Sequence, residues 1–209
     1  MRATTRSRLP ATPRRRIGGR SARVVHDVLE ATVDALATAG YSALSFEHVA
    51  ARAGVSRTTI YRRWPTKQDL VRAALLRFAD ACPKISDTGS LRGDLQANLR
   101  AILDPEHAAR QAGLLRALMA DFDDPELVAL SRIVRERMRQ PAIAAVERAI
   151  ARGELPPGTD PDVVIEPTAF TVVMRQAIFG DVVDADYGER LLDVILAGAR
   201  TGAAVKPRR

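Results

Sequence analysis

The residue types best suited to chemistry in this sequence crowd into the short segment 57–64, which holds three arginines, two threonines and one tyrosine. If the segment is helical, with about 100° between successive residues, Ile60 and Trp64 share one face that suits a protein core. The polar side chains then divide into two sets. Thr58, Thr59 and Arg62 point away from that core edge, and Arg57, Tyr61 and Arg63 lie nearer its flanks.

The outward-pointing set has the chemistry of a DNA reader. An arginine guanidinium pairs with guanine through two hydrogen bonds, and the threonine methyl group can contact the methyl group of thymine. Tyr61 and Arg63 carry donors that suit phosphate oxygens. Lys67 follows at an expected helix start, where free N–H groups already favour an anion. Taken alone, the same residues also fit an ordinary surface helix.

Two short helices separated by a glycine turn are predicted to position this segment. Ser45 is an expected N-cap, and an apolar helical repeat follows it until Gly54. Ser56 caps the next helix, which Pro65 ends, and Thr66 caps a longer helix that runs to about residue 83. A short helix, a tight turn and a second helix with one buried edge form a helix-turn-helix signature.

The chain before these helices begins with a basic stretch. Residues 1–20 hold seven arginines, two prolines and two glycines with little apolar periodicity, which predicts a flexible arm. A helical repeat then runs from Ser21 to Gly40, a residue that suits a helix C-terminus. Two interpretations of the arm stay open. It enters the minor groove beside the segment 57–64, or it is a solvated tail that attracts DNA without specific contacts.

Charge is unevenly distributed along the chain. Residues 1–78 hold 15 Lys and Arg against five Asp and Glu, a net +10, whereas residues 79–209 hold 17 against 20, a net −3. We therefore expect only the first part to meet a polyanion. Charge alone leaves a basic surface without any partner as the alternative, but the helix pattern and the arginine-rich arm favour DNA.

The rest of the chain is predicted to be helical throughout, because apolar residues recur at helical spacing without the alternation of strands. Asp160 and Pro161 are typical of an N-cap followed by proline at the first helical position, and Pro167 is expected to kink the helix that follows. Residues 203–209 are expected to form a frayed basic tail. The predicted helices span residues 91–103, 106–122, 125–152, 161–179 and 186–199.

Several classes of protein are disfavoured by what the sequence contains. Cys82 is the single cysteine, so no internal disulfide can form, which fits a cytoplasmic protein. No apolar run approaches the roughly 20 residues that span a bilayer, and the N-terminus lacks the apolar core of a secretory signal. The three histidines share no ligand-like spacing, and no catalytic motif stands out. We expect no enzyme, no metal, no cofactor and no membrane partner.

The stretch LSFEHVAARAGVSRTTIYRRWPTKQDLV resembles the N-terminal domain of the TetR family of bacterial repressors. The resemblance rests on the VAARAGVS turn, on T-I-Y-x-x-W in the second short helix, and on P-T-K-x-x-L at the start of the next. A second segment, ARGELPPGTDPDVV, resembles more weakly the segment before the dimerising helices of such regulators. One departure is Arg63, where many relatives carry histidine; arginine keeps a phosphate donor there.

The resemblance implies an all-α fold in which a three-helix DNA-binding domain precedes a helical domain for ligand binding and dimerisation. The implied units are an arm at 1–20, the helix-turn-helix domain at 21–66, a connecting helix at 67–83, the second domain at 84–202 and a tail at 203–209. Thr58, Thr59 and Arg62 would face bases, with Arg57 nearby. The implied phosphate contacts are Ser45, Tyr61, Arg63 and Lys67, and Ser56 begins the reading helix.

The resemblance also implies a homodimeric repressor that binds a partly palindromic double-stranded operator and is released by an unknown small molecule. A ligand-blind architectural DNA-binding protein is the main alternative, and an enzyme the third class. The last two helices would pair with their symmetry mates through Val164, Ala169, Val172, Leu192, Ile195 and Ala199. The candidate ligand-pocket residues are Gln111, Leu115, Arg116, Met119, Phe122, Met138, Phe170 and Met174.

Overall fold

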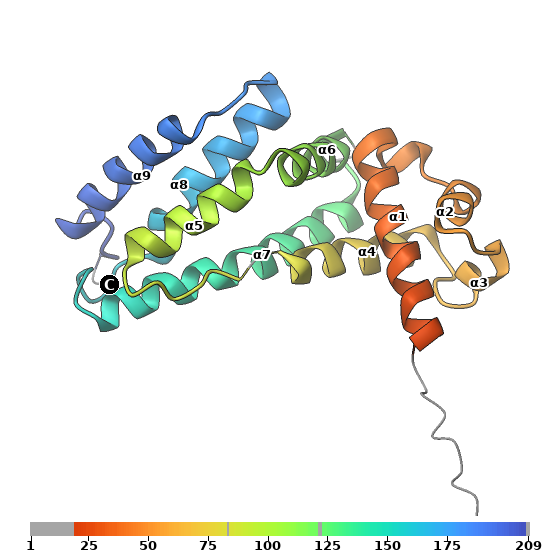
Figure 1. The fold of residues 1–209 in the computed structure, drawn as a ribbon, viewed down its shortest axis with the longest axis horizontal. Helices are drawn as coiled ribbons and strands as arrows, with labels where there is room; N and C mark the ends of the chain where they lie inside the picture. Colours follow the sequence, from red (N-terminus) through yellow and green to blue (C-terminus); the bar gives the residue numbers. More distant parts are fainter. Residues whose placement is uncertain (1–18, 83, 121–122, 208–209) are drawn as a thin grey trace, which may run out of the picture.

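The structure, a computed structural model, describes residues 19–82, 84–120 and 123–207, and every regular element within these ranges is a helix. Figure 1 shows α1 to α3 gathered at one end of an elongated molecule, with α5, α8 and α9 at the other end. The all-α prediction is confirmed. The elements are α1 Gly19–Ala43, α2 Phe46–Ala53, α3 Arg57–Tyr61, α4 Lys67–Ala81, α5 Leu91–Leu103, α6 Pro105–Ala120, α7 Pro125–Ala151, α8 Pro161–Met174, the π-helical turn η1 Arg175–Phe179, and α9 Ala185–Arg200.

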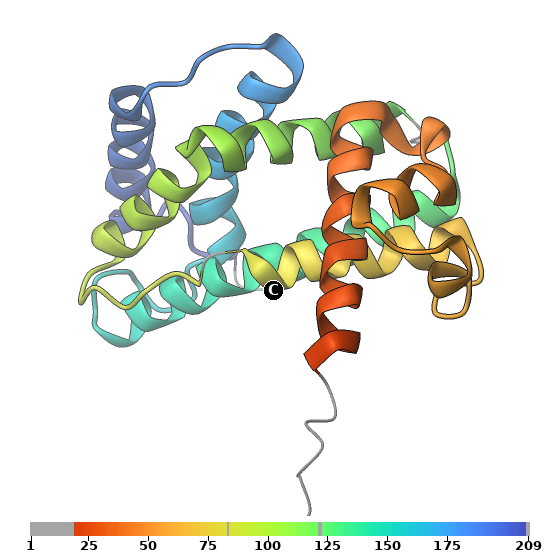
Figure 2. The same cartoon turned by 45° about the vertical axis from the view of Figure 1, so that its right-hand side comes forward.

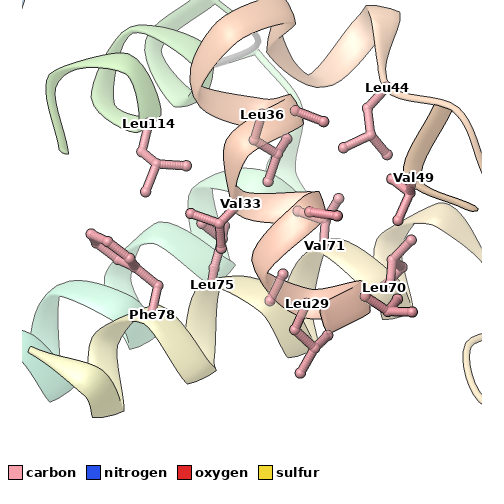
Figure 3. Close-up of a cluster of buried hydrophobic side chains, with 14 of the residues drawn as sticks. Leu29, Val33, Leu36, Leu44, Val49, Leu70, Val71, Leu75, Phe78 and Leu114 are labelled. Carbon is pink, nitrogen blue, oxygen red and sulfur yellow. The ribbon is translucent and has the colours of Figure 1, made fainter. Parts of the chain in front are cut away.

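One buried apolar cluster holds the N-terminal helices together (Figure 3). Val33 of α1, Val49 of α2 and Leu75 of α4 have almost no exposed surface and lie close together in it. The cluster does not end with these helices, because Leu114 of α6 and Leu130 of α7 also belong to it. The N-terminal helices are therefore seated on the C-terminal bundle by a shared core.

A close backbone approach joins α1 and α6, which Figure 2 shows side by side. A Cβ atom at Gly113 of α6 would lie only 2.4 Å from the carbonyl oxygen of Ala37, so the contact requires glycine. Beside it, the guanidinium of Arg110 lies 2.6 Å from the Glu30 carboxylate and 3.0 Å from that of Asp34. Tight packing and ion pairs thus join the two parts of the molecule.

The C-terminal helices have two further clusters. Leu91 of α5, Val146 of α7 and Leu192 of α9 belong to the larger one. The smaller one includes Leu99 of α5 and Val172 of α8. The apolar interior of the bundle α5–α9 is therefore divided into separate clusters, unlike that of α1–α4. No helix among the described residues is long and apolar enough to cross a membrane.

The predicted break of the first helix at Gly40 is confirmed: this residue has a non-helical backbone (φ 82°), and a short further stretch of helical turns then reaches Ala43. Three other local predictions differ from the structure. The regular part of α3 ends at Tyr61 rather than just before Pro65, although Trp64 N–H still donates to the carbonyl of Ile60 at 2.9 Å. Near the other end, the single helix predicted for residues 161–179 is divided: α8 runs through Pro167 to Met174, and η1 continues it with a π-helical hydrogen-bond pattern.

The third difference is at the C-terminus, where the predicted frayed tail is wrong for residues 203–207. Ala204 is buried in the larger C-terminal cluster, and its carbonyl accepts a 2.7 Å hydrogen bond from Asp160 N–H. Lys206 N–H donates to the carbonyl of Gly158. The segment therefore pairs with the loop between α7 and α8. The predicted arm, apart from its last two positions, lies outside the described residues.

Candidate nucleic-acid interface

Local hydrogen bonds begin the two short helices at the predicted caps, and Gly54 ends the first of them as predicted. The hydroxyl of Ser45 accepts from His48 N–H at 3.2 Å, and that of Ser56 accepts from Thr59 N–H at 3.3 Å. Between them, Gly54 has a left-handed backbone (φ 65°), which a residue with a Cβ atom rarely adopts. This glycine lets the chain turn tightly enough for α3 to follow α2 at a fixed angle.

The inner and outer sides of α3 agree with the expected assignment. Ile60 has 0% exposure in the N-terminal core, and Trp64 packs against the same core while partly exposed. Thr58 and Arg62 are exposed on the other side. Thr59 is only half-buried, and its hydroxyl lies 2.9 Å from that of Ser56, so part of its hydrogen-bonding capacity serves the cap.

Tyr61 and Arg57 lie together at the flank of α3. The Tyr61 ring stacks on Phe46 of α2, with 4.3 Å between ring centroids, yet 41% of the residue stays exposed. The Arg57 guanidinium lies 5.8 Å from the centre of the Tyr61 ring and 2.7 Å from the carboxylate of Glu47. A hydrogen bond to Tyr61 and the charge of Glu47 raise the pKa of Arg57. The guanidinium is thus held between an aromatic face and an anion.

The remaining basic residues contact the neighbouring helices. Arg63 donates to the hydroxyl of Ser21 at 2.6 Å, which brings the start of α1 beside the end of α3. The ammonium group of Lys67 lies 3.3 Å from the Ser42 carbonyl and 4.3 Å from the centre of the Tyr41 ring. Sequence reasoning missed these contacts because the partners are far apart along the chain.

All nine predicted DNA-binding residues therefore lie on or beside the two short helices and the start of α4. Glu47 is an additional member of this surface, and the buried ring of Phe46 supports it from below; the sequence analysis selected neither as a site residue. An acidic residue in the first turn of a helix suits the helix dipole, so Glu47 looked like an ordinary helix-start residue. Its position ten residues before Arg57 gives no local signal of their contact.

The candidate ligand-pocket residues do not share one environment. Met138 packs against the N-terminal core, whereas Met119 and Phe170 are exposed. Arg116 donates to the carbonyl of Ala177 in η1 at 3.1 Å. Leu115, Met174 and Gln111 are half-buried, and Phe122 lies outside the described residues.

Two open grooves of about 330 and 350 Å³ lie elsewhere, and neither contains any of these candidates. The first lies between α1 and α2, and the second between α4 and α7. The second includes Cys82, where burial raises the pKa of the thiol to about 11. A thiol with this pKa remains protonated at neutral pH and is a weak nucleophile. Among the described residues, no group of three or more His, Cys, Asp or Glu side chains could hold a metal ion.

Comparison with known proteins agrees with this geometry. The family model for bacterial regulatory proteins of the tetR family matches residues 28–74, and the tetracyclin repressor-like C-terminal domain matches residues 85–195. The DNA-binding transcriptional repressor TetR of Mycobacteroides abscessus is 32% identical over 181 residues, covering 84% of this chain and 94% of that protein. The HTH-type transcriptional regulator AqdR of Rhodococcus erythropolis is 32% identical over 182 residues, covering 86% of each chain.

A solved structure has the same fold: a TetR-family transcriptional regulator of Mesorhizobium loti superposes with a TM-score of 0.69 at 20% identity, covering 88% of this chain and 98% of that one. The two family models together cover both parts of the molecule, and the exposed helix α3 lies within the first match. The chain therefore belongs to the TetR family of DNA-binding transcriptional regulators, a class of regulators and not of enzymes.

Proposed function

We propose that this regulator is a homodimeric repressor that binds a partly palindromic operator and is released from it by a small molecule. The observation that carries the DNA-binding part is the exposed side of α3 opposite Ile60. Thr58 and Arg62 read base edges there, because both are exposed on the side of the recognition helix that points away from the core, and such a helix lies in the major groove. Tyr61, Arg63 and Lys67 hold phosphates at its flanks. Repression is suggested by the name of the relative from Mycobacteroides abscessus.

Exposed apolar side chains on the last helices support the dimer. Val163 and Phe170 lie seven positions apart on α8, hence on one face, and Phe170 is 63% exposed. Val194 on α9 is 68% exposed, and Phe179 at the end of η1 is 73% exposed. Exposed apolar groups mark an interaction surface where they gather on neighbouring elements, and α8 and α9, which carry three of these four side chains, are packed against each other. A twofold dimer built on them would bind an inverted repeat.

The individual residues first expected to form the dimer surface need correction. Val164, Val172, Leu192 and Ala199 are buried inside their own protomer, so their side chains are not available to a partner. Because α8 is apolar around much of its circumference, its sequence does not distinguish the inward face from the outward one. The outward residues Val163, Phe170 and Val194 replace them in the proposal.

Unsatisfied polar atoms support an effector site in the C-terminal bundle. The side-chain oxygens of Gln111 on α6 and Thr168 on α8 are buried and have no hydrogen-bond partner among the described residues. Buried polar atoms normally have such partners. An effector that enters between these helices would supply the missing partners with a few polar groups of its own.

Variants that separate base reading from phosphate binding test the DNA-binding proposal. DNA selected from a random pool by the purified protein supplies the operator. Arg62→Ala should weaken its binding by about 1–3 kcal/mol and relax preference at one or two base positions. Lys67→Ala and Tyr61→Phe should weaken binding to all sequences alike, and Lys67→Ala should reduce the salt slope by about one unit. An equal loss on every sequence for Arg62→Ala would contradict base reading.

Two measurements test the dimer and the effector. Analytical ultracentrifugation should detect a dimer at micromolar concentration, and a stable monomer would contradict it.

The effector is tested with a panel of apolar compounds, which is screened for compounds that raise the thermal stability of the protein. Each hit is titrated with and without operator DNA. Effector and DNA should weaken each other by the same factor, typically about 1–3 kcal/mol. If no compound changes DNA affinity, the ligand-blind architectural class is favoured.

A further inference from the structure

The ion pair between Glu47 and Arg57 joins the first turns of the two short helices. Glu47 lies in the first turn of α2, and Arg57 is the first residue of α3. Their charged groups are 2.7 Å apart, and both side chains are more than half exposed. The pair therefore lies on the surface of the helix-turn-helix. A pair buried in the core would only stabilise the packing of the two helices.

The arginine is held on a second side by stacked rings. Its guanidinium lies 5.8 Å from the centre of the Tyr61 ring, a distance at which a cation is attracted to an aromatic face. Tyr61 is itself stacked on Phe46 of α2. Glu47 and the rings together restrict a side chain that would otherwise sample many rotamers.

The recorded contact with Glu47 uses only the terminal nitrogen Nη2 of Arg57. Arg57 also hydrogen-bonds with Tyr61, but a guanidinium has five N–H donors in a planar fork, so donors remain for a further acceptor. Guanine accepts two hydrogen bonds from one arginine in the major groove. An arginine that is oriented in advance loses less entropy when it forms this pair.

The carboxylate also affects where phosphate can bind. In helix-turn-helix complexes the first helix crosses the DNA backbone, and the second enters the groove. A negative charge in the first turn of α2 repels phosphate close to Arg57, and like charges at an interface disfavour the wrong partner. A carboxylate at this position would therefore lower affinity for DNA in general and leave Arg57 free to contact a base.

We propose that Glu47 is a specificity-determining positioning residue, which holds Arg57 for a base contact and excludes phosphate from it. The proposal rests on the placement of α3 in the major groove described above. It separates two quantities that a purely structural ion pair would change together: general affinity for DNA and preference for one base.

The test compares Glu47→Gln, which keeps the side-chain shape but removes the charge, with Arg57→Ala and with the double variant. Glu47→Gln should raise affinity for random DNA several-fold and increase the magnitude of the salt slope by about one unit. It should also lower the preference for the base read by Arg57 about tenfold. In the Arg57→Ala background, Glu47→Gln should not change that preference further.

Asp80→Asn is the matched control, because Asp80 forms an ion pair of similar exposure with Arg137 at the far end of α4. It should change neither quantity. Circular dichroism verifies that each variant folds. The proposal is overturned if Glu47→Gln leaves base preference intact, or if it lowers affinity for all sequences by one factor. If Arg57→Ala, Arg62→Ala and Lys67→Ala all leave DNA binding unchanged, the proposed interface itself fails.

Discussion

The helices α1–α4 and the bundle α5–α9 bury their apolar residues in different ways. In the first region one cluster gathers the buried side chains of all four helices. In the second, the buried residues form two separate clusters, and of the ten exposed large apolar side chains among the described residues, nine lie beyond α4. The buried apolar residues of the N-terminal region are thus covered once it rests on α6 and α7. The C-terminal region keeps apolar side chains exposed, and there we propose that a second protomer binds.

The difference has a functional meaning. A DNA reader gains from a rigid support, because misplaced side chains lose their contacts with base edges. If the bundle α5–α9 pairs with a second protomer and responds to a ligand, as we propose, it must instead keep exposed surface and alternative conformations available for them. The contact of α1 with α6 is where these two kinds of packing meet.

Loss of the fully buried side chain of α3 should have the largest effect. Ile60→Ala should destabilise the N-terminal region by about 2–5 kcal/mol, because it leaves a cavity beneath the helix. Trp64, the single tryptophan, reports this region by fluorescence during urea unfolding. Ile133→Ala, at a residue that is 40% exposed on α7, is the comparison and should lose much less. Equal losses in the two variants would contradict the contrast in packing.

A substitution on the outward face of α8 should have a nearly equal effect, but on the free energy of dimer formation and not on the stability of the protomer. Phe170→Glu should weaken the proposed dimer by about 2 kcal/mol or more, as expected for a central aromatic contact. Sedimentation over a range of concentrations measures this change. The unfolding of the N-terminal region, followed by Trp64 fluorescence in the monomeric concentration range, should stay the same. A variant that dimerises like the original protein would exclude Phe170 from the interface.

Adding a methyl group at the junction of the two regions should have an intermediate effect on the free energy of unfolding. Gly113→Ala would place a Cβ atom against the Ala37 carbonyl, and overpacking of this kind costs about 1–3 kcal/mol. Thermal unfolding followed by Trp64 fluorescence and by circular dichroism should then show the two regions separating. Ala109→Ser, on the exposed side of the same helix, should leave both transitions together. Unchanged stability of Gly113→Ala would show that α1 and α6 move apart freely.

The ion pairs at the same junction should contribute least to the free energy of unfolding. Arg110→Gln removes contacts with Glu30 and Asp34 and should lower stability by up to about 1 kcal/mol, since exposed and half-exposed pairs are screened by water. The loss should shrink in 1 M NaCl, which shortens the range of charge interactions. Asp186→Asn, which breaks the more exposed pair with Arg190, should change stability less. A salt-independent loss for Arg110→Gln would indicate packing as its cause.

Much of the helix pattern could be predicted because its signals are local. Ser45, Ser56 and Thr66 each accept a hydrogen bond from a backbone N–H three residues later, so the sequence contains both partners. The fifth helix was expected at 91–103 and spans Leu91–Leu103. The orientation of α3 was also predictable, since Ile60 and Trp64 are the apolar pair on a helix that is otherwise polar around most of its surface.

The sequence by itself therefore determined the helices, their caps, the side of α3 that faces outward and the family of the protein. Only the tertiary structure decided which face of α8 is buried, that Glu47 meets Arg57, and that residues 203–207 dock against the loop before α8. The physical reason is the same in each case. Caps and amphipathic faces depend on residues within one or two turns, whereas these contacts join side chains or backbone groups whose separation is set by the packing of whole helices.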